Sequence, residues 1–116
     1  LGGVFFKSKN PEELRKWYSE KLGLHSESWG AMFPFSEKEM GYQVWSPTKI
    51  DNNYFAPSES SFMINFRVDN LEEFMEQLAK NGVELIGKPD FSDYGKFAWV
   101  LDPDGNKIEL WEAPKK

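Results

Sequence analysis

The chain has 116 residues, 40% of them hydrophobic, a size that fits one compact domain with its own core. Its net charge is −5 and its 14 Lys and Arg residues are scattered, which excludes the basic surface typical of nucleic-acid binding. Cysteine is absent, so there is no disulfide or thiol chemistry. The sequence shows no signal-peptide pattern and no apolar run near the roughly 18 residues that span a bilayer, so we expect a cytoplasmic protein.

The first predicted elements are a strand over residues 3–7 and a helix between Asn10 and Gly23. Asn10 can cap the free backbone amides at the start of the helix, and Pro11 suits the first helical position. Gly23 is expected to end the helix. Apolar residues recur through the helix at the spacing of one face: Leu14, Trp17, Tyr18 and Leu22.

Three short strands, separated by glycines and a polar stretch, are predicted after this helix. They cover residues 24–28, 31–35 and 42–46. Residues 48–61 are rich in Asn, Ser and Pro, which is typical of a linker, and a segment of this length could fold over a ligand.

The same order of elements recurs after the linker. We predict a helix that begins at Asn70 and closes at Gly82, flanked by strands over residues 63–68, 83–86, 96–101 and 106–111. Between the last two strands, residues 102–105 read Asp-Pro-Asp-Gly. This order suits a type I turn, which favours Asp first, Pro second and Gly fourth.

The two halves of the chain form an internal repeat. An offset of sixty residues places Phe6 on Phe66 and Asn10 on Asn70, and an offset of sixty-six places Trp45 on Trp111. The sequence therefore predicts an α+β fold in one domain over residues 1–116. Two βαβββ modules, about 1–54 and about 60–114, would form a curved mixed-sheet cup.

The alternation of side chains along each strand separates an apolar face from a mixed one. The apolar face is expected to pack under the helices: Val4, Phe6, Ile64, Phe66, Val68, Ile108 and Leu110. The mixed face is expected to line the cup: Phe5, Lys7, Trp45, Met63, Asn65, Arg67, Lys107, Glu109 and Trp111. Aromatic bulk with a few polar groups is typical of a ligand pocket, and the alternative is a face that meets solvent.

These modules resemble the vicinal oxygen chelate superfamily, which includes glyoxalase I, bleomycin-resistance proteins and extradiol dioxygenases. The resemblance covers nearly the whole chain and implies the glyoxalase-like fold. It is carried by Gly2-Gly3-Val4-Phe5-Phe6 with Trp17-Tyr18 and Leu22-Gly23, and by Asp102-Pro103-Asp104-Gly105-Asn106-Lys107-Ile108-Glu109-Leu110.

The resemblance also implies four metal-ligand positions, because metal-using members place a His or Gln on the first strand of each module and a Glu near the end of the last. Here these positions hold Gly3, Met63, Gln43 and Glu109. Only Gln43 and Glu109 offer oxygen donors, whereas a catalytic metal site needs about three protein ligands. We expect no metal cofactor, with a divalent metal held by Glu109 and Gln43 as the alternative. The single histidine, His25, misses these positions and is expected at the surface or a strand edge.

Glu109 has three candidate roles: a metal ligand, a general base that works without metal, or a structural or binding carboxylate. In the third role it would pair with Lys7, with Arg67 or with a cationic ligand. Lys7, Asn65 and Arg67 would instead offer donors to a carboxylate or carbonyl group. The charge of the ligand therefore stays open.

The predicted function is a glyoxalase/bleomycin-resistance-like small-molecule-binding protein that lacks a complete metal site. The alternative is an enzyme of the same superfamily that uses Glu109 as metal ligand or general base. It would be a lyase, an isomerase or a dioxygenase. A third hypothesis is a purely structural module. A homodimer is expected, because small members of the superfamily commonly pair. The predicted ligand-binding residues are Phe5, Lys7, Gln43, Trp45, Met63, Asn65, Arg67 and Trp111.

Overall fold

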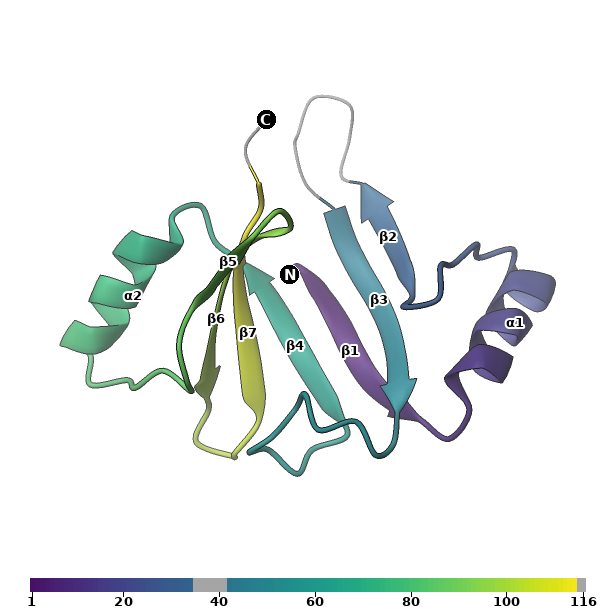
Figure 1. Ribbon diagram of the computed structural model, residues 1–116, viewed down its shortest axis with the longest axis horizontal. Helices are drawn as coiled ribbons and strands as arrows, with labels where there is room; N and C mark the ends of the chain where they lie inside the picture. The colour runs from purple at the N-terminus through teal and green to yellow at the C-terminus, as the bar shows by residue number, and fades with distance from the viewer. Residues whose placement is uncertain (35–41, 115–116) are drawn as a thin grey trace.

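A computed structural model of the chain describes residues 1–34 and 42–114 (Figure 1). Part of the predicted 31–35 strand, at residue 35, and the polar stretch after it lie outside the described residues. The elements are β1 (Gly3–Ser8), α1 (Pro11–Leu22), β2 (Ala31–Pro34), β3 (Tyr42–Lys49), β4 (Phe62–Arg67), α2 (Leu71–Lys80), β5 (Asp90–Ser92), β6 (Gly95–Leu101) and β7 (Lys107–Glu112).

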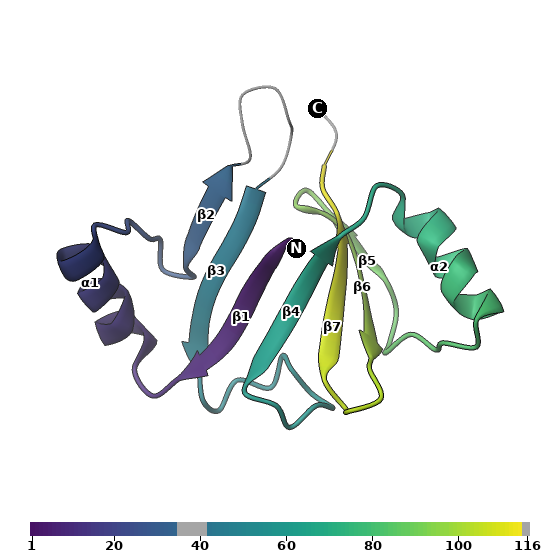
Figure 2. The ribbon, with the colours of Figure 1, turned by 180° about the vertical axis from the view of Figure 1, so that it is seen from behind.

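The strands form one mixed sheet in the order β2-β3-β1-β4-β7-β6-β5. β1 runs parallel to β3, β4 runs parallel to β7, and β1 and β4 meet antiparallel at the centre, so the two halves share the same pairing. The sheet is curved, with α1 and α2 at its two far ends (Figures 1 and 2). α1 packs against β3 and β1, and α2 against β6 and β7. The predicted α+β fold is confirmed.

Both helices begin where the sequence predicts. The side chains of Asn10 and Asn70 accept hydrogen bonds from the backbone amides of Glu13 (3.1 Å) and Glu73 (3.0 Å). Gly23 ends α1 in the left-handed conformation, with φ of 72°, which a glycine adopts without steric cost. None of the helices in the described ranges is long and apolar enough to cross a membrane.

Two predicted strands are wrong. Residues 24–28 form no strand and contribute only an isolated bridge between Glu27 and Gly30, and His25 on this segment is exposed. Residues 83–86 form a connection, because Val83 and Leu85 pack against the core under α2 and their apolar pattern comes from that packing. β5 is the outer strand of this half instead.

The buried core lies between α2 and the β6–β7 half of the sheet. It consists of Leu71, Ala98, Val100 and Leu110. No residue of α1 is fully buried, and its contacts with the sheet include the ring of Tyr18, whose centroid lies 4.7 Å from that of Trp45. The second half of the sheet therefore carries most of the buried apolar packing.

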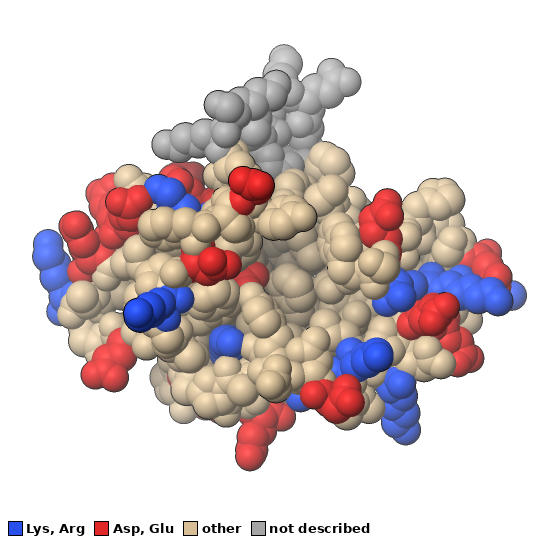
Figure 3. Space-filling model, viewed as in Figure 1, with Lys and Arg blue, Asp and Glu red and all other residues tan. Residues whose placement is uncertain are grey.

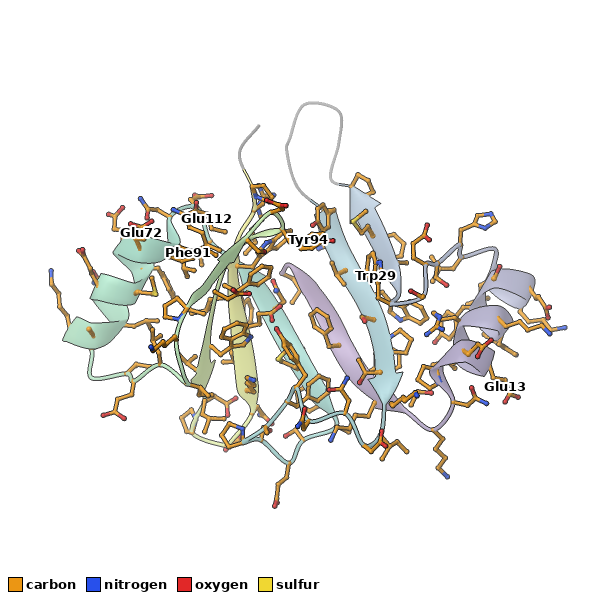
Figure 4. The ribbon with its side chains drawn as sticks, in the orientation of Figure 1. Glu13, Trp29, Glu72, Phe91, Tyr94 and Glu112 are labelled. Atoms are coloured by element: carbon orange, nitrogen blue, oxygen red, sulfur yellow. The ribbon has the colours of Figure 1, made fainter. Side chains whose placement is uncertain are left out.

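Glu112 links α2 to the sheet through a hydrogen bond. Its Oε1 accepts a hydrogen bond of 2.8 Å from the backbone amide of Leu71, the first residue of α2, and Glu112 is buried (Figure 4). Because Glu112→Ala leaves this buried amide unpaired, we expect the free energy of unfolding to fall by about 1–3 kcal/mol in urea titrations. The matched change Glu84→Ala, at an exposed position, should cost less than about 0.5 kcal/mol. Equal losses in the two variants would contradict this role.

Candidate functional site

The concave face of the sheet holds a cavity of about 440 Å³. Figure 3 shows the centre of this face hollowed and lined mainly by uncharged atoms. The volume lies in the range of small-molecule sites. Residues from both halves of the sheet line it: Phe5, Glu27, Trp29, Met32, Tyr42, Val44, Asn65, Tyr94, Phe97, Glu109 and Trp111.

Aromatic side chains form most of the cavity wall. Figure 4 shows Trp29, from the segment before β2, on one side and Tyr94, from the β5–β6 turn, on the other. The ring centroid of Trp111, which also lines the cavity, lies 5.0 Å from that of Tyr42 and 6.4 Å from that of Phe97. Trp111 is further held by its Nε1, which donates a hydrogen bond of 2.8 Å to the carbonyl oxygen of Tyr94.

The carboxylate of Glu109 is the buried polar centre of this cavity, with 2% of the residue exposed. Asn65 on β4 and Trp99 on β6 are its direct neighbours in the strand register. Asn65 Nδ2 donates to Oε1 at 2.7 Å, and Trp99 Nε1 donates to Oε2 at 2.8 Å. The hydroxyl of Tyr54 donates to Oε2 at 2.5 Å. Three neutral donors therefore hold this carboxylate in one orientation.

Tyr54 comes from the linker between β3 and β4, so part of this segment folds against the site. Burial and the negative charge of Glu109 raise the pKa of Tyr54 well above its usual range, and the hydroxyl stays a donor at neutral pH. Lys107 supports Tyr54: its Nζ donates to the carbonyl oxygen of Tyr54 at 2.6 Å and lies 4.9 Å from the centroid of the ring. Burial lowers the pKa of Lys107.

The structure brings part of the predicted set together. The cavity lining includes four predicted residues, Phe5, Asn65, Glu109 and Trp111. Met63 is fully buried and is not part of the lining. Lys7 lies with its Nζ 5.6 Å from the ring centroid of Phe55, and neither Lys7 nor Arg67 lines the cavity.

Trp45 and Gln43 lie on the opposite face, so their predicted place in the cup is wrong. The register pairs Trp45 with Val4, on the face that packs against α1, where Trp45 contacts Tyr18. Gln43, two residues earlier, shares that face, and its Nε2 donates to the carbonyl oxygen of Leu1 at 3.2 Å.

The error comes from the offset between the modules near their ends. Phe5 on β1 pairs with Ser46, as Asn65 on β4 pairs with Glu109. With an offset of sixty between β1 and β4, the offset between β3 and β7 is sixty-three rather than sixty-six, so Ser46 is the counterpart of Glu109. Ser46 is buried, and its hydroxyl donates to the carbonyl oxygen of Trp29. The polar centre of the cup therefore belongs to one half only.

The side chains do not fit the metal site that the resemblance implies. Gly3 has no donor atom and packs so closely on β3 that a Cβ there would lie 2.5 Å from the carbonyl oxygen of Val44. Met63 offers a buried thioether, and Gln43 lies on the far face. Residues 1–34 and 42–114 hold no group of three His, Cys, Asp or Glu side chains able to hold a metal ion. Of the four positions, only that of Glu109 brings an oxygen donor to the cavity.

Several site residues were missed from the sequence. Tyr54 and Trp99, which hold Glu109, carry no motif, although the alternation along β6 places Trp99 on the same face as Phe97. Others lie in turns, on β3, whose face was misassigned, or on β2 and β6, for which no face was predicted. The missed lining residues are Glu27, Trp29, Met32, Tyr42, Val44, Tyr94 and Phe97.

Comparison with solved structures identifies the same fold in proteins of distant sequence. A methylmalonyl-CoA epimerase is 19% identical, with a TM-score of 0.68 over 99% of this chain and 95% of that one. A Streptomyces coelicolor methylmalonyl-CoA epimerase variant in complex with 2-nitronate-propionyl-CoA is 9% identical, with a TM-score of 0.71 over 99% and 97%. A Legionella pneumophila protein described as an NAD-dependent benzaldehyde dehydrogenase is 19% identical, with a TM-score of 0.64 over 97% and 98%. Identities this low support the fold alone.

The sequence itself carries a family signature. No curated protein shows significant similarity to the chain. A profile described as Glyoxalase/Bleomycin resistance protein/Dioxygenase superfamily matches residues 4–110, which is most of the chain. The chain therefore belongs to the glyoxalase/bleomycin resistance protein/dioxygenase superfamily.

Proposed function

We propose that the chain is a small-molecule-binding protein of the glyoxalase/bleomycin-resistance type that binds its ligand without the complete metal site of the superfamily. The observation that carries this proposal is the cavity of about 440 Å³ with aromatic walls and one fixed carboxylate. Small-molecule sites combine apolar walls with a few placed polar groups in this way.

Binding without a metal is supported by the surroundings of Glu109. A carboxylate that serves as a metal ligand needs partner ligands, and Gly3 and Met63 supply none. Instead, both carboxylate oxygens accept hydrogen bonds from neutral donors. These bonds replace the water that Glu109 loses on burial, so the carboxylate needs no cation to be accommodated.

A second candidate is an enzyme in which Glu109 removes a proton from a bound substrate. One observation favours it: Oε1 accepts one hydrogen bond, from Asn65, which leaves acceptor capacity on a carboxylate that belongs to the cavity lining. Methylmalonyl-CoA, named in the similar structures, is a suitable first substrate. Deuterium uptake from D2O at its α-carbon, lost in Glu109→Gln, would support the enzyme over the binder.

The five tryptophans offer a direct test of cavity binding. Trp29 and Trp111 line the cavity, whereas Trp17 and Trp45 lie at α1 on the other face. In ¹⁵N-labelled protein, we expect ligands from a mixed fragment library to shift the indole signals of the first pair and leave those of the second pair unchanged. A library that shifts none of them, or all of them equally, would contradict the proposal.

The homodimer stays a prediction and forms part of the same proposal. It is supported by aromatic side chains of α1, β4 and α2 that are more than a third exposed: Trp17, Phe62, Phe66 and Phe74. Sedimentation equilibrium measures the oligomeric state directly.

A further inference from the structure

We propose that the ligand of the cavity is an organic cation, a protonated amine carried on a planar apolar body. This inference rests on the proposed small-molecule binding and adds the chemical class of the ligand. It follows from the charges, the free acceptor positions and the aromatic faces that the cavity presents.

The charges of the cavity lining all have one sign. Among the residues that the structure describes, the lining contains two carboxylates, Glu27 and Glu109, and no Lys, Arg or His. Lys7 and Arg67, the residues that left the ligand's charge open in the sequence, are outside this lining. Lys107 interacts electrostatically with Glu109, but its Nζ is bonded to the carbonyl oxygen of Tyr54 and it also lies outside the lining. A cationic ligand would therefore be attracted and an anionic one repelled.

The two carboxylates lie at different depths. Glu27 is exposed on the segment between α1 and β2, and Glu109 is 2% exposed. An ammonium group entering past Glu27 would thus meet a second, desolvated carboxylate deeper in the cavity. Attraction between charges strengthens as water is excluded, so the deeper contact contributes more to affinity.

The hydrogen-bonding groups also favour a ligand that donates. Glu109 Oε1 accepts one hydrogen bond from Asn65, although a carboxylate oxygen can accept two. Asn65 Oδ1 also has no hydrogen-bond partner among the described residues, but it is buried against Gly2 and offers no acceptor to a ligand. The indole N–H groups of Trp99 and Trp111 are already engaged, with Glu109 and with the carbonyl oxygen of Tyr94. Spare acceptor capacity on the Glu109 carboxylate, beside engaged donors, complements an N–H-bearing ligand.

The aromatic walls suit the same ligand class. Trp29, Tyr42 and Trp111 are all in the lining, and the faces of Trp and Tyr rings attract cations within about 6 Å. Phe5 and Phe97 add apolar area against which a planar ring system can pack. The amine and its apolar body would therefore find separate partners in one cavity.

Three probes of the same size separate charge from shape: tryptamine, a cation; tryptophol, which is neutral; and indole-3-acetate, an anion. Titrations followed by the indole signals of Trp29 and Trp111 should give a dissociation constant for tryptamine at least fivefold below that for tryptophol. Indole-3-acetate should bind most weakly. Raising the ionic strength should reduce the preference for tryptamine, because salt screens the carboxylates.

A matched pair of variants assigns the preference to the cavity. Glu27→Gln should weaken tryptamine binding about threefold and leave tryptophol binding unchanged. Glu76→Gln removes the same charge from an exposed position on α2, away from the cavity lining, and should change neither value. Equal losses in the two variants would mean that net charge, rather than the cavity, attracts the cation, and would overturn the proposal.

The outcomes distinguish this inference from the proposed function. If tryptophol or indole-3-acetate shifts the signals of Trp29 and Trp111 with equal or higher affinity, the cavity binds small molecules but the cation class is wrong. If no probe at millimolar concentration shifts these two signals, and the fragment library shifts none either, both proposals fail.

Discussion

Glu109→Leu is expected to lower the free energy of unfolding by about 3 kcal/mol or more, because one buried and one half-buried N–H donor lose their acceptor at about 1–3 kcal/mol each. The donors are Asn65 Nδ2 and Trp99 Nε1, and neither can accept a hydrogen bond in return. The hydroxyl of Tyr54 also loses its partner, but this residue is 42% exposed and can turn to water. Equilibrium unfolding in urea measures the loss.

Glu109→Gln is the control, and it should cost less than Glu109→Leu, because only one N–H donor is left without an acceptor, at about 1–3 kcal/mol. The new amide oxygen can accept from Tyr54 and Trp99, as Oε2 does now. The new amide nitrogen would face Asn65, whose Oδ1 has no hydrogen-bond partner within residues 1–34 and 42–114. A half-turn of the Asn65 amide presents this oxygen as the acceptor for the new amide nitrogen and turns Nδ2 to the place that Oδ1 holds now. Only the Asn65 amide then lacks its former acceptor, whereas Trp99 keeps one.

The same control separates binding from folding. Because Glu109→Gln removes the charge and keeps the shape, we expect tryptamine binding to weaken at least tenfold in a protein that still folds. If Glu109→Leu is as stable as the unsubstituted chain, the hydrogen-bonded network is not structural. If Glu109→Gln binds tryptamine normally, the carboxylate is not the partner of the cation.

Local signals in the sequence predicted the elements of the fold well. The Asn caps at Asn10 and Asn70 act within three residues of themselves, so their effect can be inferred without knowing the partner strands. The same holds for Gly23 and for the turn at residues 102–105, where Gly105 N donates to the carbonyl oxygen of Asp102 at 3.0 Å. It was harder to predict which segments form strands. Residues 83–86 have an apolar pattern because they pack under α2, and they form no strand.

The site depended on register, which local signals do not contain. A shift of one residue moves a strand's side chains to the other face, and the misjudged offset at β3 put Gln43 and Trp45 in the cup in place of Tyr42 and Val44. On β7 the assumed face was right, and Glu109 and Trp111 line the cavity. Tyr54 could not be predicted because the path of an irregular linker depends on what it meets in space.

Gly95→Ala is expected to be strongly damaging at the rim of the site, with a loss of about 3 kcal/mol or more from backbone strain and a steric clash together. Gly95 begins β6 with φ of 121°, a conformation that side-chain-bearing residues rarely adopt. A Cβ there would lie 2.2 Å from the carbonyl oxygen of Glu112 and 2.7 Å from Trp111 Nε1. Strand β7 or the indole of Trp111 must move to make room.

Gly82→Ala separates the two causes. Gly82 also has a positive φ, 78°, but a Cβ there would meet nothing within 4 Å, so only the strain of about 1–2 kcal/mol remains. The excess loss in Gly95→Ala therefore reports the close approach to β7 together with the more restricted backbone conformation at φ of 121°. Because Trp111 Nε1 donates to the carbonyl oxygen of Tyr94, the same variant should shift the indole signal of Trp111 and weaken ligand binding. Equal losses in the two variants, with the Trp111 signal unmoved, would show that the contact with β7 relaxes freely and that this glycine does not shape the cavity.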